Sequence, residues 1–410
     1  MLFRFSLYGF LKNQQYYDPF LILAFLEKGL SFFQIGLLIG FREVCINLFE
    51  IPSGAVADMY GRRHAMMLSM VAYIASFLIF GMSHTLWLLF IAMFFFAIGE
   101  AFRTGTHKAL IFEWLRSQNR TDEKTKVYGY TRSWAKIGSA VSVIIAAALV
   151  FYRGRYSDVF WFSIPPYVAN IINFLGYPAS LDGTPSREFS LKKTALTLWQ
   201  TLKASAAEPT LRRLFVETMG FEGTYKVTKD YLQPILKRTA VNLPVLLWLG
   251  TDKRSAILVG IVYFLLYLLS MIASRNSYRF SSHMGGLHEA ALVNWKISFL
   301  LFLALIPILG FNIHAVAILL FIGLEILQNF WRPVQVTRFD TYSDTTKGAT
   351  ILSIDSQAKS IFTMIAAPLL GFAVDHSGLW TIAVLGTGIS LIMLSTSPWK
   401  TRTPMSAGSS

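Results

Sequence analysis

The chain has 410 residues, of which 54% are hydrophobic and only 15% are charged, and its mean hydropathy is +0.49. Soluble proteins carry about 25% charged residues, so this composition excludes a soluble protein and indicates residence in a lipid bilayer. The net charge of +14 does not indicate nucleic-acid binding, because Lys and Arg gather at the ends of apolar segments and form no single basic face. The only cysteine, Cys45, lies inside an apolar segment, which excludes disulfides and thiolate metal sites.

Twelve apolar segments follow one another along the chain, each close to the roughly 20 helical residues that a bilayer core requires. The first six are residues 6–27, 32–57, 64–82, 86–114, 127–151 and 159–177. The second six are residues 211–236, 255–274, 294–310, 313–331, 350–373 and 378–396, and charged residues interrupt the first of these. The pattern predicts an all-α integral membrane protein with twelve transmembrane helices.

A polar interval, residues 178–210, separates an N-terminal unit (1–177) from a C-terminal unit (211–396). Within it Leu191, Ala195, Leu198 and Leu202 recur at helical spacing, which predicts an amphipathic helix on the membrane surface, with a plain linker as the alternative. Residues 397–410 are small and polar, and we expect this tail to be disordered.

The basic residues next to the spans predict the orientation. Twenty lie on the side that both termini share, and seven lie on the opposite side. Because loops rich in Lys and Arg stay in the cytoplasm, both termini are expected to be cytoplasmic. The expected location is the plasma membrane, which is the inner membrane in a Gram-negative bacterium.

A basic turn follows the second span. Gly54 and Asp58 lead into Gly61, Arg62 and Arg63, and apolar spans flank this turn closely on both sides. Gly54 is small enough for close helix contact, Gly61 permits a sharp reversal, and the arginines hold the reversal in the cytoplasm. The segment resembles the G-x-x-x-D-x-x-G-R-R motif that major facilitator superfamily transporters carry between their second and third helices.

The resemblance implies two pseudo-symmetric six-helix bundles around a site at the membrane midplane. It also implies a gate in which Asp58 contacts the backbone near Thr350 and the basic Arg116. Two departures stand out. The corresponding turn after the eighth span, read as residues 274–279, lacks the motif, and the fifth span lacks the Gly-Pro pair typical of drug/proton antiporters.

Thirteen charged residues lie near the middle of spans, where each costs about 2.5–3.5 kcal/mol if left unpaired. They are Asp18, Arg42, Glu43, Glu100, Arg103, Arg132, Lys136, Glu217, Glu222, Lys226, Glu325, Asp355 and Lys359. Most of them must therefore pair or face an interior cavity. Three duos have the helical spacing of an ion pair: Glu100 with Arg103, Glu222 with Lys226, and Asp355 with Lys359.

The predicted substrate site consists of basic residues that would meet in one central space if the halves pack as in the superfamily, together with two acids. They are Arg103, Arg132, Lys136, Lys226 and Lys359, with Glu222 and Asp355. Such a set favours an anionic or zwitterionic solute, although ion pairs that lock helices together would give the same pattern.

Asp18 is the preferred proton carrier, because it lies at mid-depth beside Gln14 and before the helix-kinking Pro19. An ion pair of Asp18 with Arg42 or Arg132 is the alternative. The further candidate proton carriers are Glu100, Glu43 and Glu325.

Motifs of enzymes and ATPases are missing from the sequence: His288-Glu289 lacks the second histidine of a zinc protease, and there is no phosphate loop. The sequence therefore predicts a monomeric secondary transporter without cofactor or metal, which moves a small charged solute with protons. The alternatives are an exporter of hydrophobic drugs or metabolites and a non-transporting membrane receptor or assembly partner.

Overall fold

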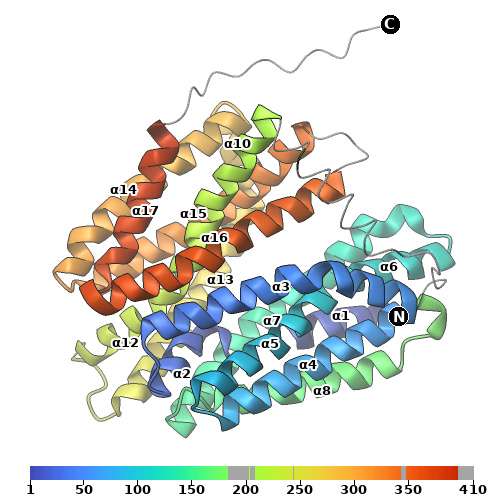
Figure 1. The fold of residues 1–410 in the computed structure, drawn as a ribbon, viewed down its shortest axis with the longest axis horizontal. Helices are drawn as coiled ribbons and strands as arrows, with labels where there is room; N and C mark the ends of the chain where they lie inside the picture. Colours follow the sequence, from blue (N-terminus) through green and yellow to red (C-terminus); the bar gives the residue numbers. More distant parts are fainter. Residues whose placement is uncertain (183–202, 204–207, 243, 343–347, 396–410) are drawn as a thin grey trace, which may run out of the picture.

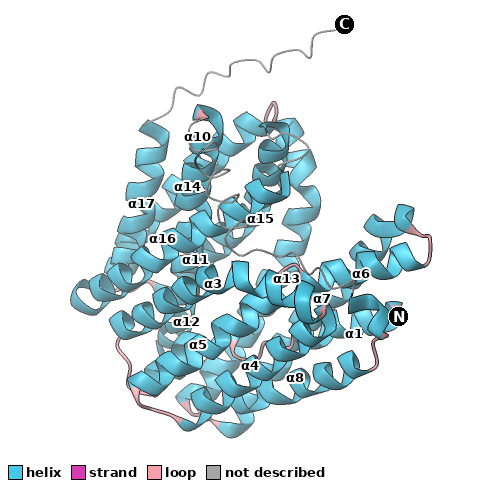
Figure 2. Cartoon of the chain, turned by 45° about the vertical axis from the view of Figure 1, so that its right-hand side comes forward, coloured by secondary structure: helices cyan, strands magenta, loops and turns pink. Residues whose placement is uncertain are grey.

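The computed structural model describes residues 1–182, 203, 208–242, 244–342 and 348–395. Helices dominate these residues, and none of them forms a β-strand (Figure 2). This confirms the predicted all-α fold. The amphipathic helix predicted around residues 191–202 and the tail 397–410 lie outside the described residues.

We describe the helices in two halves, before and after the polar interval 178–210. The N-terminal half contains α1 (Leu2–Lys12), α2 (Leu21–Glu27), α3 (Phe32–Tyr60), α4 (Arg62–Met82), α5 (Leu86–Arg103), α6 (Thr106–Ser117), α7 (Lys124–Arg153) and α8 (Val159–Leu175). The C-terminal half contains α10 (Pro209–Thr218), α11 (Thr224–Thr228), α12 (Leu232–Asn242), α13 (Thr251–His283), α14 (Leu287–Gly310), α15 (His314–Tyr342), α16 (Gly348–Ser377) and α17 (Trp380–Ser395).

Eight segments of the described chain are apolar and long enough to cross a membrane. They are Phe32–Glu50, Arg62–Met82, Leu86–Ser117, Thr121–Arg153, Thr251–His283, Leu287–Gly310, His314–Thr341 and Ile354–Ser377. The shorter apolar helices α8 and α17 coincide with two further predicted spans. The two remaining predicted spans, 6–27 and 211–236, fall on interrupted helices.

The first and fourth spans are broken where the sequence predicts continuous helices. The first breaks after Lys12 and resumes in a short 3₁₀ turn that contains Pro19, whose ring removes a backbone donor. The fourth breaks after Arg103, and Gly105 begins the next helix with φ of +79°, a conformation that favours glycine. Non-helical backbone at membrane depth is tolerated where it is buried in protein or lines a polar cavity.

The seventh span is the most irregular. It includes a π-helical turn, Met219–Gly223, and a 3₁₀ turn, Lys229–Tyr231. A π turn bonds residue i to i+5, so the spacing rule of an α-helix fails across it. Glu222 and Lys226, which flank the end of this π turn, bind other partners and do not form the ion pair that their spacing predicts.

Two predicted loops are helical. Helix α13 continues to His283, so residues 274–279 form no turn, and the reversal comes at Gly285 and Gly286, both with positive φ. Helix α15 continues to Tyr342, which places Arg332 inside a helix and not in a loop. In each case the helix continues beyond the apolar stretch, and the polar residues that were read as a loop belong to the helix.

The two halves meet along α3 with α16 and α7 with α13 (Figure 1). Glycines permit the first contact: a Cβ at Gly36 would collide with the carbonyl of Ala367, and one at Gly40 would lie 2.8 Å from the carbonyl oxygen of Met364. Small residues at such positions let membrane helices approach closely.

Hydrogen bonds join the halves at one end of the molecule. The backbone amides of Phe32 and Phe33 donate to the Asp375 carboxylate at 3.0 and 2.8 Å. The Tyr156 hydroxyl donates to Asp252 at 2.8 Å, and because burial raises the pKa of Tyr156 this hydroxyl keeps its proton. At the opposite end, α6 and α10 lie well apart (Figures 1 and 2). The sequence predicts the joined end to be extracellular.

Candidate functional site

A cavity of about 420 Å³ lies in the N-terminal half between α1, α5, α6 and α7. The side chains on its walls include the basic residues Lys12, Arg103, His107, Lys108 and Arg132 and the aromatic residues Phe5, Tyr8 and Tyr128. We call it the basic cavity. Arg103 and Arg132 were predicted to bind substrate, whereas Lys12, His107 and Lys108 were missed because they lie beside helix breaks that the hydropathy pattern does not reveal.

Glu100 on α5 fixes the position of Arg103. Its carboxylate accepts hydrogen bonds from the Arg103 guanidinium and from the Tyr73 hydroxyl on α4. The predicted ion pair between Glu100 and Arg103 is therefore confirmed. Because both carboxylate oxygens are engaged, Glu100 serves the basic cavity as a positioning group in this conformation.

A second cavity, of about 260 Å³, lies where the first span meets the seventh, eighth and tenth. Its charged residues are Asp18, Lys229, Asp230 and Glu325, and Tyr225, Tyr263 and Tyr267 line it as well. We call it the acidic cavity. Three carboxylates and one lysine line it, and the lysine pairs with Asp18 and Asp230, which leaves an excess of negative charge when all three acids are ionised.

Asp18 pairs with neither Arg42 nor Arg132, contrary to the alternative drawn from the sequence. Its carboxylate lies 4.0 Å from Lys229 Nζ and accepts a 3.3 Å hydrogen bond from the Tyr267 hydroxyl. Lys229 was overlooked because it belongs to the irregular seventh span. Both contacts join the two halves of the molecule.

Glu325 on α15 is the least neutralised acid of this cavity. Its Oε1 accepts 2.8 Å hydrogen bonds from the Ser270 hydroxyl and the Asn329 amide. Among the residues that the structure describes, no basic side chain lies within ion-pair distance of it. Hydrogen bonds from neutral groups leave the charge of an ionised carboxylate uncompensated, so Glu325 is suited to take up a proton.

Glu43 on α3 connects the halves at mid-molecule. Its side chain is 1% exposed and accepts hydrogen bonds from Lys226 Nζ at 2.7 Å and from the Ser360 hydroxyl at 2.8 Å. Arg42 donates to its other oxygen at 2.8 Å. Lys226 thus pairs across the interface with Glu43 and not with Glu222.

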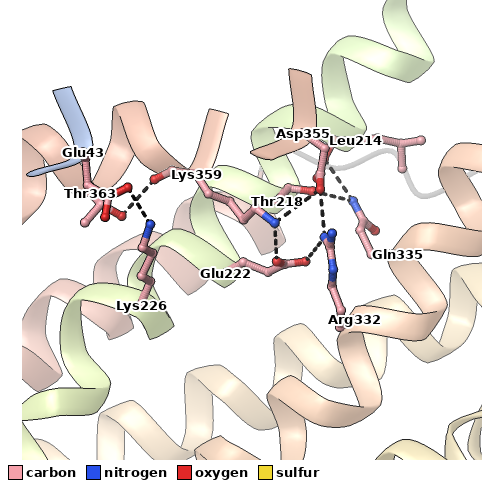
Figure 3. Close-up of polar contacts among 10 residues, drawn as sticks. All are labelled: Glu43, Leu214, Thr218, Glu222, Lys226, Arg332, Gln335, Asp355, Lys359 and Thr363. Carbon is pink, nitrogen blue, oxygen red and sulfur yellow. Dashed lines mark hydrogen bonds and ion pairs between the residues drawn. The ribbon is translucent and has the colours of Figure 1, made fainter. Parts of the chain in front are cut away.

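Four charged residues form a cluster within the C-terminal half (Figure 3), while Glu217 binds Arg213 and Arg338 apart from it. Arg332 Nη1 lies 2.9 Å from Glu222 and 2.8 Å from Asp355, while Lys359 Nζ lies 3.0 Å from Glu222 and 3.3 Å from Asp355. We call these four residues the C-terminal charge cluster. It confirms the predicted pair of Asp355 with Lys359, and it balances two acids with two bases.

The five predicted basic residues therefore do not meet in one space. Arg103 and Arg132 line the basic cavity, Lys226 binds Glu43, and Lys359 belongs to the C-terminal charge cluster. Lys136 is exposed on α7. The predicted convergence is not seen in this conformation, because Lys226 and Lys359 bind acids of the interface and of the C-terminal charge cluster and do not line the basic cavity.

Residues 13–354, most of the chain, match the sequence profile described as Major Facilitator Superfamily. The chain belongs to this superfamily. It is accordingly a multi-pass membrane transporter and not an enzyme, which sets aside the receptor alternative. Solved structures of the superfamily's fold agree with the arrangement of helices described above.

Among those structures, a mutant form of the nucleoside transporter NupG superposes with a TM-score of 0.75 at 13% identity, covering 96% of this chain and 98% of that one. A POT family transporter in complex with 5-aminolevulinic acid gives 0.72 at 15% identity, covering 97% and 96%. At these identities the likeness shows the shared fold alone.

Curated relatives match shorter stretches. The "Uncharacterized transporter BU466" of Buchnera aphidicola subsp. Acyrthosiphon pisum is 30% identical over 156 residues, which are 35% of this chain and 37% of that protein. Multidrug resistance protein MdtH of Salmonella typhimurium is 25% identical over 138 residues, 33% of each chain. The chain thus matches about a third of the length of each relative.

The superfamily's turn motif has the predicted backbone. Gly61 separates α3 from α4 with φ of +96°. Gly54 makes no close helix contact in this conformation, since a Cβ there would meet nothing within 4 Å. It lies toward the end of α3 where the halves are apart, and the close approach occurs at Gly36 and Gly40 instead.

The basic residues of the turn bind within the N-terminal half. Arg62 and Arg116 both contact the Glu113 carboxylate, at 3.5 and 2.8 Å. Asp182 accepts a 2.7 Å hydrogen bond from the Arg63 backbone amide and thereby caps α4, a role that the sequence did not indicate. The side chains of Asp58 and Thr350, the other partners of the predicted gate, lie outside the described part of the chain.

Proposed function

We propose that this transporter moves a small anionic or zwitterionic solute by alternating access, and that protons drive it. The observation that carries the proposal is the basic cavity. Five basic side chains surround a space whose volume lies in the range of small-molecule sites. In a membrane protein, so much charge at one place is costly unless a ligand of opposite charge uses it.

Proton coupling is proposed for the acidic cavity. Asp18 and Glu325 face a space with more carboxylates than bases, so binding a proton removes electrostatic repulsion there. Asp18 also holds Lys229 and Tyr267 of the other half. Protonation would weaken these contacts and change how firmly the halves are joined, which links proton binding to the conformational change.

Alternating access is supported by the uneven contacts between the halves. They are joined at the end with Phe32, Asp375 and Tyr156, and apart at the end with α6 and α10. With the predicted orientation, this conformation is open to the cytoplasm. We propose that the opposite conformation closes the cytoplasmic end through Asp58 and Arg116.

Solute-induced proton movement in proteoliposomes tests the proposal. The purified protein is reconstituted with a pH-sensitive dye inside, and organic acids, amino acids, phosphate esters and cationic drugs are added in turn. An anionic or zwitterionic solute should change internal pH in loaded vesicles and not in protein-free vesicles. Proton movement with cationic drugs alone would contradict the proposal.

The second candidate function is export of hydrophobic compounds. The relative named a multidrug resistance protein favours it, although the match covers only a third of each chain. The two charged cavities disfavour it, because an apolar compound would leave their charges without partners. Proton-driven loss of a hydrophobic dye from the vesicles, unaffected by Arg132→Gln, would place this candidate first.

A further inference from the structure

We propose that the basic cavity binds a doubly charged anionic group, such as a phosphate monoester, and that the N-terminus of α6 forms part of this site. The inference rests on the proposed function, which it deepens from an anionic solute to a dianionic one. Three independent features of the cavity support it: its charge, the helix end that faces it, and its unpaired donors.

The charge of the cavity exceeds what one carboxylate can balance. Its walls carry four side chains that are cationic at pH 7: Lys12, Arg103, Lys108 and Arg132. Glu100 is the one carboxylate among the described residues that binds a member of this set. The excess is therefore three positive charges with His107 neutral. A monocarboxylate would leave two of them unbalanced, whereas a phosphate monoester carries close to two negative charges at pH 7.

The second feature is the break in the fourth span. Helix α5 ends at Arg103, and α6 begins at Thr106 after Gly105, which has no side chain to cap the helix. Gly105, His107 and Lys108 of this turn line the cavity. The N-terminus of a helix carries about half a positive charge and offers free backbone N–H groups, which together suit a phosphate or carboxylate. A membrane helix interrupted at mid-depth can present this end to a substrate.

The third feature is a pair of buried side-chain nitrogen atoms that make no hydrogen bond within the described structure. The two atoms are Arg103 Nε and His107 Nε2. Buried polar atoms are nearly always paired in native proteins. Both atoms belong to residues of the cavity wall, and Arg103 Nε adds a donor beside the Nη2 group that Glu100 already holds.

The walls also accommodate an organic group. Phe5 and Tyr8 are buried against the His107 ring, with ring centroids 5.7 and 3.9 Å away, whereas Tyr128 near Lys108 is only half-buried. An aromatic side chain such as Tyr128 favours a planar ring attached to the charged group. The geometry therefore points to an organic phosphate more than to inorganic phosphate.

Calorimetric binding to the purified full-length protein tests this inference with phenyl phosphate and benzoate, two aromatic anions of double and single charge. Phenyl phosphate should bind at least tenfold more tightly, which corresponds to about 1.4 kcal/mol. Arg132→Gln should weaken phenyl phosphate binding at least tenfold and benzoate binding by a smaller factor, so that most of this preference is lost. Arg132 is exposed and has no acid to leave unpaired among the described residues, so this variant should fold.

Arg153→Gln is the matched control, because Arg153 lies on the same helix as Arg132 but at its other end, outside the cavity. It should bind both anions like the unaltered protein. Equal affinities for the two anions in the unaltered protein, or equal effects of the two substitutions on phenyl phosphate, would overturn the inference.

A phosphate monoester could come from a solute or from a lipid headgroup. The titration is therefore repeated in nanodiscs of phosphatidylcholine with and without phosphatidic acid, whose headgroup is a phosphate monoester. Competition by phosphatidic acid, with no phenyl phosphate uptake into proteoliposomes, would identify the lipid as the source, whereas uptake would identify a solute. If benzoate is taken up with protons while phenyl phosphate does not bind, the proposed function stands and this inference falls.

Discussion

Glu43 and Lys226 form an ion pair at 2.7 Å between the two halves, although Lys226 lies one helical turn from another acid, Glu222. The carboxylate is almost fully buried and also holds Arg42 and Ser360. Breaking such a contact requires either a proton on Glu43 or movement of the seventh span. The pair therefore connects the charge state of the interior with the way in which the halves are joined.

The first prediction is that Glu43→Gln destabilises the protein by about 2–3 kcal/mol, less than the roughly 3–5 kcal/mol of a fully buried pair because Lys226 is 34% exposed. The substitution leaves Arg42 and Lys226 without their shared acid. A double-mutant cycle with Lys226→Met, followed by thermal unfolding in detergent, should give a coupling of about 1–2 kcal/mol. Additive effects of the two substitutions on the free energy of unfolding would show that the two side chains have no interaction energy with each other.

The second prediction concerns the acidic cavity. Glu325→Gln and Asp18→Asn should each reduce gradient-driven accumulation at least tenfold while preserving exchange of solute, because exchange requires no net movement of protons. The measurement is uptake into proteoliposomes with and without a proton gradient. Glu289→Gln, which changes an exposed acid at the start of α14, is the control and should behave normally. Full accumulation by both cavity variants would remove these residues from the coupling mechanism.

The third prediction concerns charge balance in the C-terminal charge cluster. Asp355→Asn should destabilise the protein by about 2–3 kcal/mol, since it leaves Arg332 and Lys359 to share Glu222, and since Asp355 is fully buried while Arg332 is 38% exposed. Adding Lys359→Gln restores the balance of one acid and one base. Thermal unfolding should show that the double variant regains at least half of the loss. A double variant as unstable as the sum of the two would contradict a role for charge balance.

The hydropathy pattern was sufficient to predict the all-α membrane fold. The motif around Gly61 identified the superfamily correctly, because the backbone of that turn needs a glycine with positive φ. Charge spacing was reliable only within regular helix: Glu100 with Arg103 and Asp355 with Lys359 form pairs as predicted.

What the sequence did not reveal depends on breaks and on tertiary contacts. The π turn that contains Glu222 and the interruption after Arg103 have no hydropathy signal, yet they decide which charges meet. Gly105 was the available sign of the second break, since a glycine within a predicted span often marks one. The contact between Glu43 and Lys226 depends on the packing of two distant segments, which no local pattern specifies.

The last prediction tests the close contact of α3 with α16. Gly40→Ala places a methyl group against the carbonyl oxygen of Met364, and separating the helices should cost about 1–3 kcal/mol. Gly54→Ala on the same helix is the matched control: nothing lies within 4 Å of its new methyl group, so it should be neutral or stabilise the helix by up to about 1 kcal/mol. Thermal unfolding in detergent measures both effects.

The same substitution should also change access to the acidic cavity, because the contact at Gly40 belongs to the interface that joins the halves at the predicted extracellular end. In a background with Cys45→Ser, Thr228→Cys supplies a label site on the cavity wall. A membrane-impermeant thiol reagent added from outside should react faster with the Gly40→Ala variant than with the Gly54→Ala variant, since a loosened contact favours the outward-open conformation. Equal labelling rates would show that α3 and α16 separate elsewhere during transport.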